Sequence, residues 1–276
     1  MTGHHDDPFR RLRPVARLLR PFKPLLLAIF RVTNAGLRRL ASTTHRAQQF
    51  VEWGVPPVPE WYDHYLDIYS QWPRSGSSLS LERGVFGSLA AEPGSRILDL
   101  CCGDGFNAAH FYAYRADRVE AVDFDPDAIA YACRYNARKN VSYRVLDIRE
   151  SLPDGPFDLV TWDAAIEHFT DSEICRILQS IRGVLGTVGV LSGYTIIERH
   201  DGRKYLPQHE REFTGKEDLL GFLVDAFAYA TVFETVYPER TNLYFYASNE
   251  RTSIPFETGH LRFVTGTGRP DSGTTG

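Results

Sequence analysis

One stretch of the chain decides its fold, and it spans residues 97–108. It reads Ile97-Leu98-Asp99-Leu100-Cys101-Cys102-Gly103-Asp104-Gly105-Phe106-Asn107-Ala108. Apolar residues around one acid predict a buried strand, the two glycines predict a sharp turn, and the residues that follow can begin a helix. Open α/β sheets build nucleotide sites in this way, because a backbone without Cβ lets a ligand come close to the first amides of a helix.

Two classes of ligand fit this turn. Gly103-x-Gly105-x-x-Ala108 satisfies the loose dinucleotide pattern G-x-G-x-x-G/A. Asp99, four residues before Gly103, separates the two classes. A carboxylate at this place repels a pyrophosphate but attracts a ligand that carries a cationic amine and a sulfonium.

The wider frame Asp99-x-Cys101-x-Gly103-x-Gly105 resembles motif I of the Rossmann-like (class I) S-adenosylmethionine (SAM) methyltransferases. That motif is commonly written D/E-x-G-x-G-x-G, and here Cys101 stands at its first glycine. The resemblance implies SAM as the cofactor, lying over the two glycines with Asp99 near its amino-acid end.

A second strand, residues 119–123, ends in an acid that fits the ribose of such a cofactor. Asp123 lies 18 residues after Gly105, close to the spacing of about 20 expected for a carboxylate that binds a ribose diol. Phe124 is expected against the adenine face. Asp125 and Pro126 then predict the N-cap and first position of a helix that ends near Arg138.

Two further strands supply the remaining expected cofactor residues. The strand at 141–146 ends at Asp147 and Ile148. The resemblance implies that the Asp147 side chain meets the adenine amino group and that the next backbone amide meets the ring. The strand at 157–163 ends in Asp163, which is also assigned to the cofactor.

The rest of the chain predicts an α/β fold: a Rossmann-like, seven-stranded, mostly parallel sheet with a closing antiparallel hairpin and an N-terminal helical extension. A fifth strand is expected at 189–194, and the hairpin strands at 229–236 and 242–247. The predicted domains are a basic helical extension or lid at 1–80, a SAM-binding domain at 81–250 and a C-terminal tail at 251–276, with its end disordered.

Three residues are candidates for catalysis: His168, Glu167 and His209. His168 follows the fourth strand and could act as a general base, with Glu167 orienting it. The alternative is that this pair only caps and packs the loop before the next helix. His209 lies in the long insertion after the fifth strand, and such loops often carry function.

The same three side chains form a mixed N/O donor set that would suit a borderline metal. Some methyltransferases hold a divalent ion with an E-x-x-E-H cluster and a later histidine. The first acid of that cluster is Ala164 here, with Asp163 one place off. This departure disfavours a metal, so none is assigned, and metal binding by the three side chains stays open.

Charge is unevenly distributed along the 276 residues, whose formal net charge is −4. Residues 1–50 hold ten Arg or Lys against two acids, so the remaining 21 bases and 33 acids leave a net charge of −12. An acidic body disfavours a nucleic-acid partner, because phosphate binding needs a basic groove. The four cysteines form no C-x-x-C pair, which fits reduced thiols and a cytoplasmic location.

The N-terminal segment interleaves basic and apolar residues. Its apolar run at 25–30 is far shorter than the roughly 20 residues needed to cross a bilayer. Peripheral contact with an anionic membrane is one interpretation. An accessory helix whose basic residues face solvent or the acidic body is the other. Six aromatic residues follow, and these predict either a lid over the cofactor or packing against the sheet edge: Trp53, Trp61, Tyr62, Tyr65, Tyr69 and Trp72.

Together these features predict a SAM-dependent methyltransferase that acts on a small-molecule or saccharide acceptor, preferably at an oxygen. Asp163-Ala164-Ala165-Ile166 stands where an Asn/Asp-Pro-Pro-Tyr/Phe motif would indicate methylation of a base or a glutamine amide. Two alternatives stay open: a nicotinamide-dependent oxidoreductase, and a SAM-binding or membrane-docked protein without catalysis.

Overall fold

The computed structural model describes residue 15 and the ranges 18–56, 58–66, 68–69, 79–199, 202, 204–237, 240–251 and 254–255. The chain divides into two compact units. The N-terminal unit comprises Met1–Pro59 and Tyr65–Gly76, and the sheet unit comprises Glu60–His64 and Ser77–Gly276. Residues 60–64, called the strap below, thus belong to the sheet unit although the chain on both sides of them belongs to the N-terminal unit.

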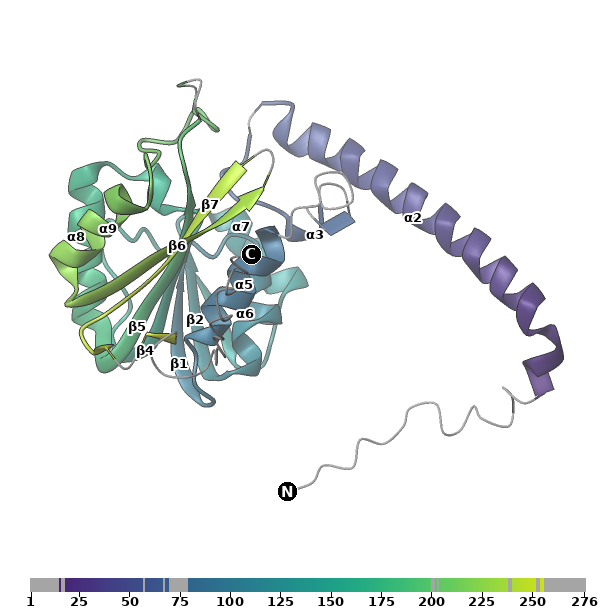
Figure 1. Ribbon diagram of the computed structural model, residues 1–276, viewed down its shortest axis with the longest axis horizontal. Coiled ribbons are helices and arrows are strands. Elements are labelled where there is room, and N and C mark those ends of the chain that lie inside the picture. Colours follow the sequence, from purple (N-terminus) through teal and green to yellow (C-terminus); the bar gives the residue numbers. More distant parts are fainter. Residues whose placement is uncertain are drawn as a thin grey trace, which may run out of the picture. The chain divides into compact units, whose positions relative to one another are not determined.

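The sheet unit is built on a seven-stranded sheet with the order β3-β2-β1-β4-β5-β7-β6 (Figure 1). All neighbouring strands run parallel except the pairs β5–β7 and β6–β7, which are antiparallel. The predicted Rossmann-like sheet with its closing hairpin is therefore confirmed. The strands are β1 (Ser95–Leu100), β2 (Ala116–Asp123), β3 (Val141–Val145), β4 (Phe157–Asp163), β5 (Leu185–Ile196), β6 (Tyr229–Tyr237) and β7 (Arg240–Ser248).

Helices connect the strands. They are α5 (Leu79–Leu89), α6 (Phe106–His110), η4 (Tyr112–Tyr114), α7 (Pro126–Tyr135), η5 (Ile166–His168), α8 (Asp171–Val184) and α9 (Lys216–Ala226). Asp125 caps α7 as predicted, because its side chain accepts from the backbone N of Asp127 at 2.7 Å. The predicted end of this helix near Arg138 is wrong. The backbone turns away at Asn136, whose buried amide Nδ2 donates to the backbone oxygen of Asp104 at 2.7 Å.

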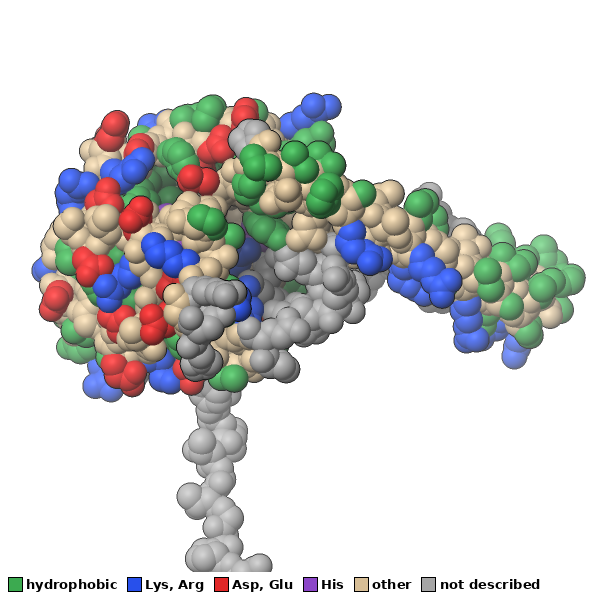
Figure 2. Space-filling view, turned by 90° about the horizontal axis from the view of Figure 1, so that it is seen from above, with side chains coloured by type: hydrophobic (Ala, Val, Ile, Leu, Met, Phe, Trp, Pro, Cys, Tyr) green, Lys and Arg blue, Asp and Glu red, His purple; other side chains and the backbone are tan. Residues whose placement is uncertain are grey.

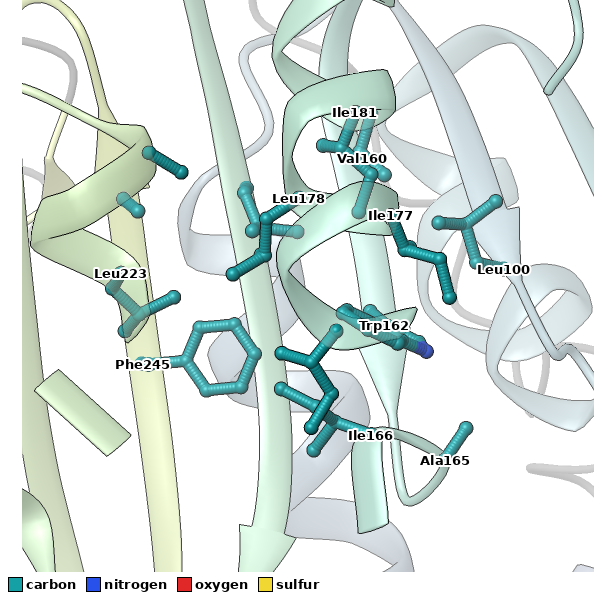
Figure 3. Close-up of a cluster of buried hydrophobic side chains, with 14 of the residues drawn as sticks. Leu100, Val160, Trp162, Ala165, Ile166, Ile177, Leu178, Ile181, Leu223 and Phe245 are labelled. Atoms are coloured by element: carbon teal, nitrogen blue, oxygen red, sulfur yellow. The ribbon is translucent and has the colours of Figure 1, made fainter. Parts of the chain in front are cut away.

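The core lies on both faces of the sheet. Alternate residues of a strand point to opposite faces, and accordingly Val160 and Trp162 belong to one buried cluster while Leu159 belongs to another. Figure 3 shows the first cluster, in which side chains of α8 and α9 cover β4 and β7. Its labelled members include Ile177, Leu178, Ile181, Leu223 and Phe245. Burying each such side chain stabilises the fold by about 1.5–3 kcal/mol, which holds the carboxyl ends of the strands in place.

The described part of the N-terminal unit is mainly helical. Its elements are η2 (Arg20–Phe22) and α2 (Lys23–Trp53), while α3 (His64–Leu66) begins in the strap. None of the helices among the described residues is long and apolar enough to cross a membrane. The first fourteen residues, Trp72, the tip of the closing hairpin at 238–239 and the predicted tail end lie outside the described residues.

Candidate active site

The turn after β1 is held in the left-handed region of backbone space at three residues. The φ angles are 53° at Cys101, 52° at Gly103 and 73° at Gly105. This conformation costs a residue with a side chain about 1–2 kcal/mol, and Cys101 adopts it at the position where the motif has its first glycine. A Cβ on Gly105 would stand 2.6 Å from Cε1 of Tyr143. The turn therefore requires glycine at 105 on grounds of both conformation and space.

Asp99 lies on β1, just before this turn, and is hydrogen-bonded to a residue of the neighbouring strand β4. Thr161 on β4 is its register partner, and Thr161 Oγ1 donates to Asp99 Oδ1 at 2.6 Å. Burial raises the pKa of Asp99 to about 8, with Asp163 and Asp123 adding to the rise against the Thr161 hydrogen bond. A cation beside it would favour the charged form, so binding of a cation here would release a proton.

Asp123, at the end of β2, closes the turn from the other side. Its Oδ2 accepts from the backbone N of Gly103 at 2.9 Å, and its Oδ1 accepts from the backbone N of Asp125 at 3.0 Å. Burial raises the pKa of Asp123, while these two backbone bonds oppose the rise. A carboxylate offers about four acceptor positions, and two therefore remain for a diol. Phe124 beside it has 46% of its surface exposed, which leaves a ring face for a ligand.

The expected adenine residues are placed in different surroundings. Asp147 forms an ion pair with Arg149, whose Nη2 lies 2.6 Å from Asp147 Oδ2. The hydrogen bonds from Arg149 lower the pKa of Asp147. Ile148 is 5% exposed and its side chain belongs to the core, so only its backbone is available, as the sequence analysis assumed. The ion pair with Arg149 was not predicted from the sequence.

Asp163, at the end of β4, accepts from the hydroxyl of Tyr112 at 2.9 Å. Burial raises the pKa of Asp163 to about 6, and the positive charge of Arg83 opposes the rise. Asp99, Asp123 and Asp163 therefore stand near one turn at the carboxyl ends of neighbouring strands. Like charges packed together in this way favour a positively charged ligand.

A buried network that no sequence pattern predicted ties the strap to the turn. The backbone N of His64 donates to Asp104 Oδ2 at 2.9 Å, and Nδ1 of the same histidine donates to Asp104 Oδ1 at 2.8 Å. Arg83 donates to His64 Nε2 at 2.8 Å, and the imidazole stacks on Phe106 with ring centroids 5.0 Å apart. The only signal in the sequence was the aromatic cluster that includes Trp61.

Glu167, His168 and His209 come together, as the sequence analysis predicted for a functional cluster. One ligand atom from each lies within 4.8 Å of the others. The rings of the two histidines meet edge to face with centroids 4.9 Å apart. The backbone N atoms of Glu210 and Arg211 donate to the backbone oxygen of Glu167 at 2.9 and 3.0 Å. These two bonds fix the long loop after β5 against η5.

Two acceptor–donor pairs orient this cluster. His209 Nδ1 lies 2.5 Å from Glu212 Oε1, and both side chains are buried, with 3% and 5% of their surface exposed. Thr195 Oγ1 on β5 donates to Glu167 Oε2 at 2.9 Å. A proton on Nδ1 of His209 leaves its Nε2 as an acceptor, which is the tautomer that both a general base and a metal ligand need. Glu212, three residues after His209, and Thr195 were not assigned a role from the sequence.

Known proteins share parts of this sequence and its fold. Residues 97–189 match a family described as a methyltransferase domain. Over residues 97–189 the chain is thus similar to methyltransferase domains, and its sheet has the Rossmann-like order described above. The chain is 30% identical over 123 residues to an uncharacterized methyltransferase, sll0829, of Synechocystis sp., covering 43% of this chain and 54% of that protein. It is 36% identical over 69 residues to a ribosomal protein L11 methyltransferase of Burkholderia mallei, covering 25% of this chain and 23% of that protein. The chain thus spans about half, or less, of the curated relatives it matches.

Solved structures share the fold of this chain. A DhpI complex with SAH matches with a TM-score of 0.51 and 22% identity, covering 78% of this chain and 99% of that one. The N-methyltransferase NodS of Bradyrhizobium japonicum, in complex with SAH, matches with a TM-score of 0.51 and 19% identity over 65% of this chain and 92% of that one. These solved structures show the fold, and the family match agrees with the predicted cofactor, S-adenosylmethionine.

The site of the methyltransferase domain also fits that cofactor by its own chemistry. It offers buried carboxyls for a cationic group at Asp99 and Asp163, and a carboxylate with two further acceptor positions for a diol at Asp123. The glycine turn leaves room for close approach. A dinucleotide would instead bring its pyrophosphate against Asp99, so the donor set favours SAM over a nicotinamide cofactor.

Proposed function

We propose that this chain is a SAM-dependent methyltransferase whose acceptor is a hydroxyl group of a small molecule or saccharide. The pairing of His209 with Glu212 carries the proposal. Alcohols are weakly acidic, so a hydroxyl acceptor benefits from a base that removes its proton as the new bond forms. The cofactor supplies a methyl group on a sulfonium, which is already activated for transfer.

The chain's own residues divide the work. Asp99, Asp123 and the Asp147–Ile148 backbone segment hold and orient the donor at the carboxyl ends of β1, β2 and β3. The acceptor hydroxyl is placed against the cluster after β4, where Nε2 of His209 takes its proton. Glu212 stabilises the resulting imidazolium through Nδ1, in the manner of a carboxylate–histidine pair. His168 and Glu167 border the same space and position the acceptor.

Charge supports a small acceptor rather than a nucleic acid. Residues 51–276 carry 21 bases and 33 acids. This net negative charge repels the phosphate backbone of a nucleic acid. The chemistry of the cluster supports oxygen over nitrogen, because a neutral amine attacks without prior loss of a proton.

The first experiment separates cofactor classes. The protein is titrated by calorimetry with SAH and, separately, with NADH. Saturable heat with SAH alone supports the proposal, whereas binding of NADH alone would replace it with the oxidoreductase alternative.

The second experiment tests the base with Glu212→Gln, and an acceptor library of alcohols and sugars supplies the substrate. A general base contributes about 10²–10⁴-fold to the rate, so kcat should fall by at least roughly 100-fold while SAH affinity stays unchanged. The matched control is Glu217→Gln, an exposed glutamate at the start of α9. Unchanged kcat in Glu212→Gln would reject the assignment. Loss of activity in a chelator, restored by a divalent ion, would instead assign Glu167, His168 and His209 to a metal site.

A further inference from the structure

The helix α2 (Lys23–Trp53) has two chemically different sides. It is 31 residues long and has no buried residue. With about 100° between successive residues, Ile29 and Leu40 project within about 20° of each other. Leu25, Val32 and Leu37 project within about 80° of Ile29. Together with their apolar neighbours they form what we call the apolar arc.

The apolar arc is strongly exposed. The exposed fractions are 62% for Leu25, 49% for Ile29, 74% for Val32, 58% for Leu37 and 62% for Leu40. Single exposed apolar residues are ordinary. These five gather on one side of the helix, with Thr33 and Gly36 between them, and an apolar face of this kind marks a surface that binds something.

The opposite side of α2 carries positive charge. Arg31 and Arg38 project about 160–180° from Ile29, on the same side as Leu27, which is 40% exposed. Lys23 and Arg39 flank the apolar arc. From Arg20 to Trp53 the chain has six Arg or Lys residues and one acid, Glu52. In Figure 2 the blue side chains of this helix gather along one side and green ones along another.

We propose that α2 lies on an anionic membrane surface, with the apolar arc in the acyl boundary and the basic side in the headgroups. An interfacial helix needs this combination of an apolar face, basic flanks and few acids. The long basic side chains can extend outward while their methylene stems stay on the apolar layer. A helix is only about 10–12 Å wide, so even its far side lies near the Debye length of about 8 Å from the lipid charges.

The same charges disfavour a second copy of the helix as the occupant. Pairing two apolar arcs would bring Lys23 and Arg39 of one copy near the cations of the other. Glu52 alone could offset them, whereas helices that pair through such arcs are flanked by complementary charges. An anionic lipid surface satisfies the apolar arc and all six cations together.

The test measures co-sedimentation of the full chain with vesicles of phosphatidylcholine containing about one third phosphatidylglycerol, against vesicles of phosphatidylcholine alone. Binding should be confined to the anionic vesicles and weaken as salt is raised, because salt screens the charges. Ile29→Gln, Val32→Gln and Leu40→Gln together remove the centre of the apolar arc, and each should weaken binding about tenfold. Glutamine retains helix propensity, and circular dichroism checks that the helix remains. Val224→Gln, at an exposed valine of α9, is the matched control and should bind like the wild type.

A second variant tests the charges. Arg31→Gln, Arg38→Gln and Arg39→Gln together should weaken binding by about 100-fold, since each cation near an anionic surface contributes about 1 kcal/mol. Arg176→Gln with Arg182→Gln, at exposed positions of α8, should leave binding unchanged.

Equal binding to both kinds of vesicle, or no binding at low salt, would overturn the proposal. So would a dimer in sedimentation equilibrium that the apolar variant dissociates, because the arc would then belong to a second copy. None of these results depends on whether the chain transfers a methyl group.

Discussion

Replacing Asp99 with asparagine should make the ligand-free protein more stable while weakening its cofactor site. Burial raises the pKa of Asp99 from 3.8 to about 8, so the folded state holds a proton that the unfolded state has lost between these two values. Stability therefore falls as pH rises through this window. The cost of the carboxyl relative to a neutral side chain is about 2 kcal/mol at pH 5 and about 4 kcal/mol at pH 7.

The asparagine side chain has nearly the same shape as the acid and can still accept from Thr161. The Asp99→Asn protein should thus gain up to about 4 kcal/mol at pH 7, or roughly 8–16 °C in Tm for a body of this size. The gain should shrink at pH 5. Affinity for SAH should fall at the same time, because the negative charge that meets the ligand's ammonium group is gone.

Thermal and denaturant unfolding at pH 5 and pH 7 measure the first effect, and calorimetry measures the second. The control is Asp225→Asn, at an exposed carboxylate near the end of α9, which should change stability by no more than about 0.5 kcal/mol. A gain that is the same at both pH values, or no gain at all, would refute the account of Asp99 as a buried carboxyl kept ready for a cation.

Three further predictions concern the turn and the cluster. In urea titrations, Gly105→Ala should lower the free energy of unfolding by about 1–3 kcal/mol, because the new Cβ meets Tyr143 and φ is positive. The control is Gly183→Ala on α8, whose new Cβ meets nothing within 4 Å. It should raise the free energy of unfolding by about 0.5–1 kcal/mol. Cys101→Gly should raise the urea midpoint of unfolding, since glycine removes a left-handed backbone strain of about 1 kcal/mol. A lower midpoint would show that packing of the Cys101 thiol outweighs this strain. Thr195→Val should lower kcat more than it raises KM in steady-state assays, because Glu167 loses its hydrogen-bond donor but keeps its place; a change in KM alone would contradict this.

The sequence predicted the elements whose signals are local. The alternation in β1, the glycine turn and the Asp125 cap each depend on neighbours within a few residues, and each is present. The limits of β5 were harder to predict. The strand runs from Leu185 to Ile196 rather than over 189–194, because pairing with Phe157 at one end and Asn242 at the other extends it.

The site was predictable where residue type and position along a strand sufficed, as for Asp99 and Asp123. It was not predictable where a partner comes from far along the chain. His64 and Asp104 are 40 residues apart, and no periodicity links them. His209 and Glu212 are close in sequence, but they lie in an irregular loop. There, unlike in a helix or strand, the spacing of two residues does not tell which way their side chains point. The ionisation state of Asp99 depends on burial and on three other carboxyl groups, which only the folded chain assembles.

The strap makes part of the N-terminal region necessary for the sheet unit. Residues 60–64 are inserted into the sheet unit, yet the chain enters them from the N-terminal unit and returns to it afterwards. A truncation that begins at Ser77 would delete the strap together with α2. It would leave the carboxylate of Asp104 without His64 and strip a partner from Arg83, directly at the glycine turn. A truncation that removes α2 keeps the partner of this buried carboxylate only if the chain retains residues 60–64.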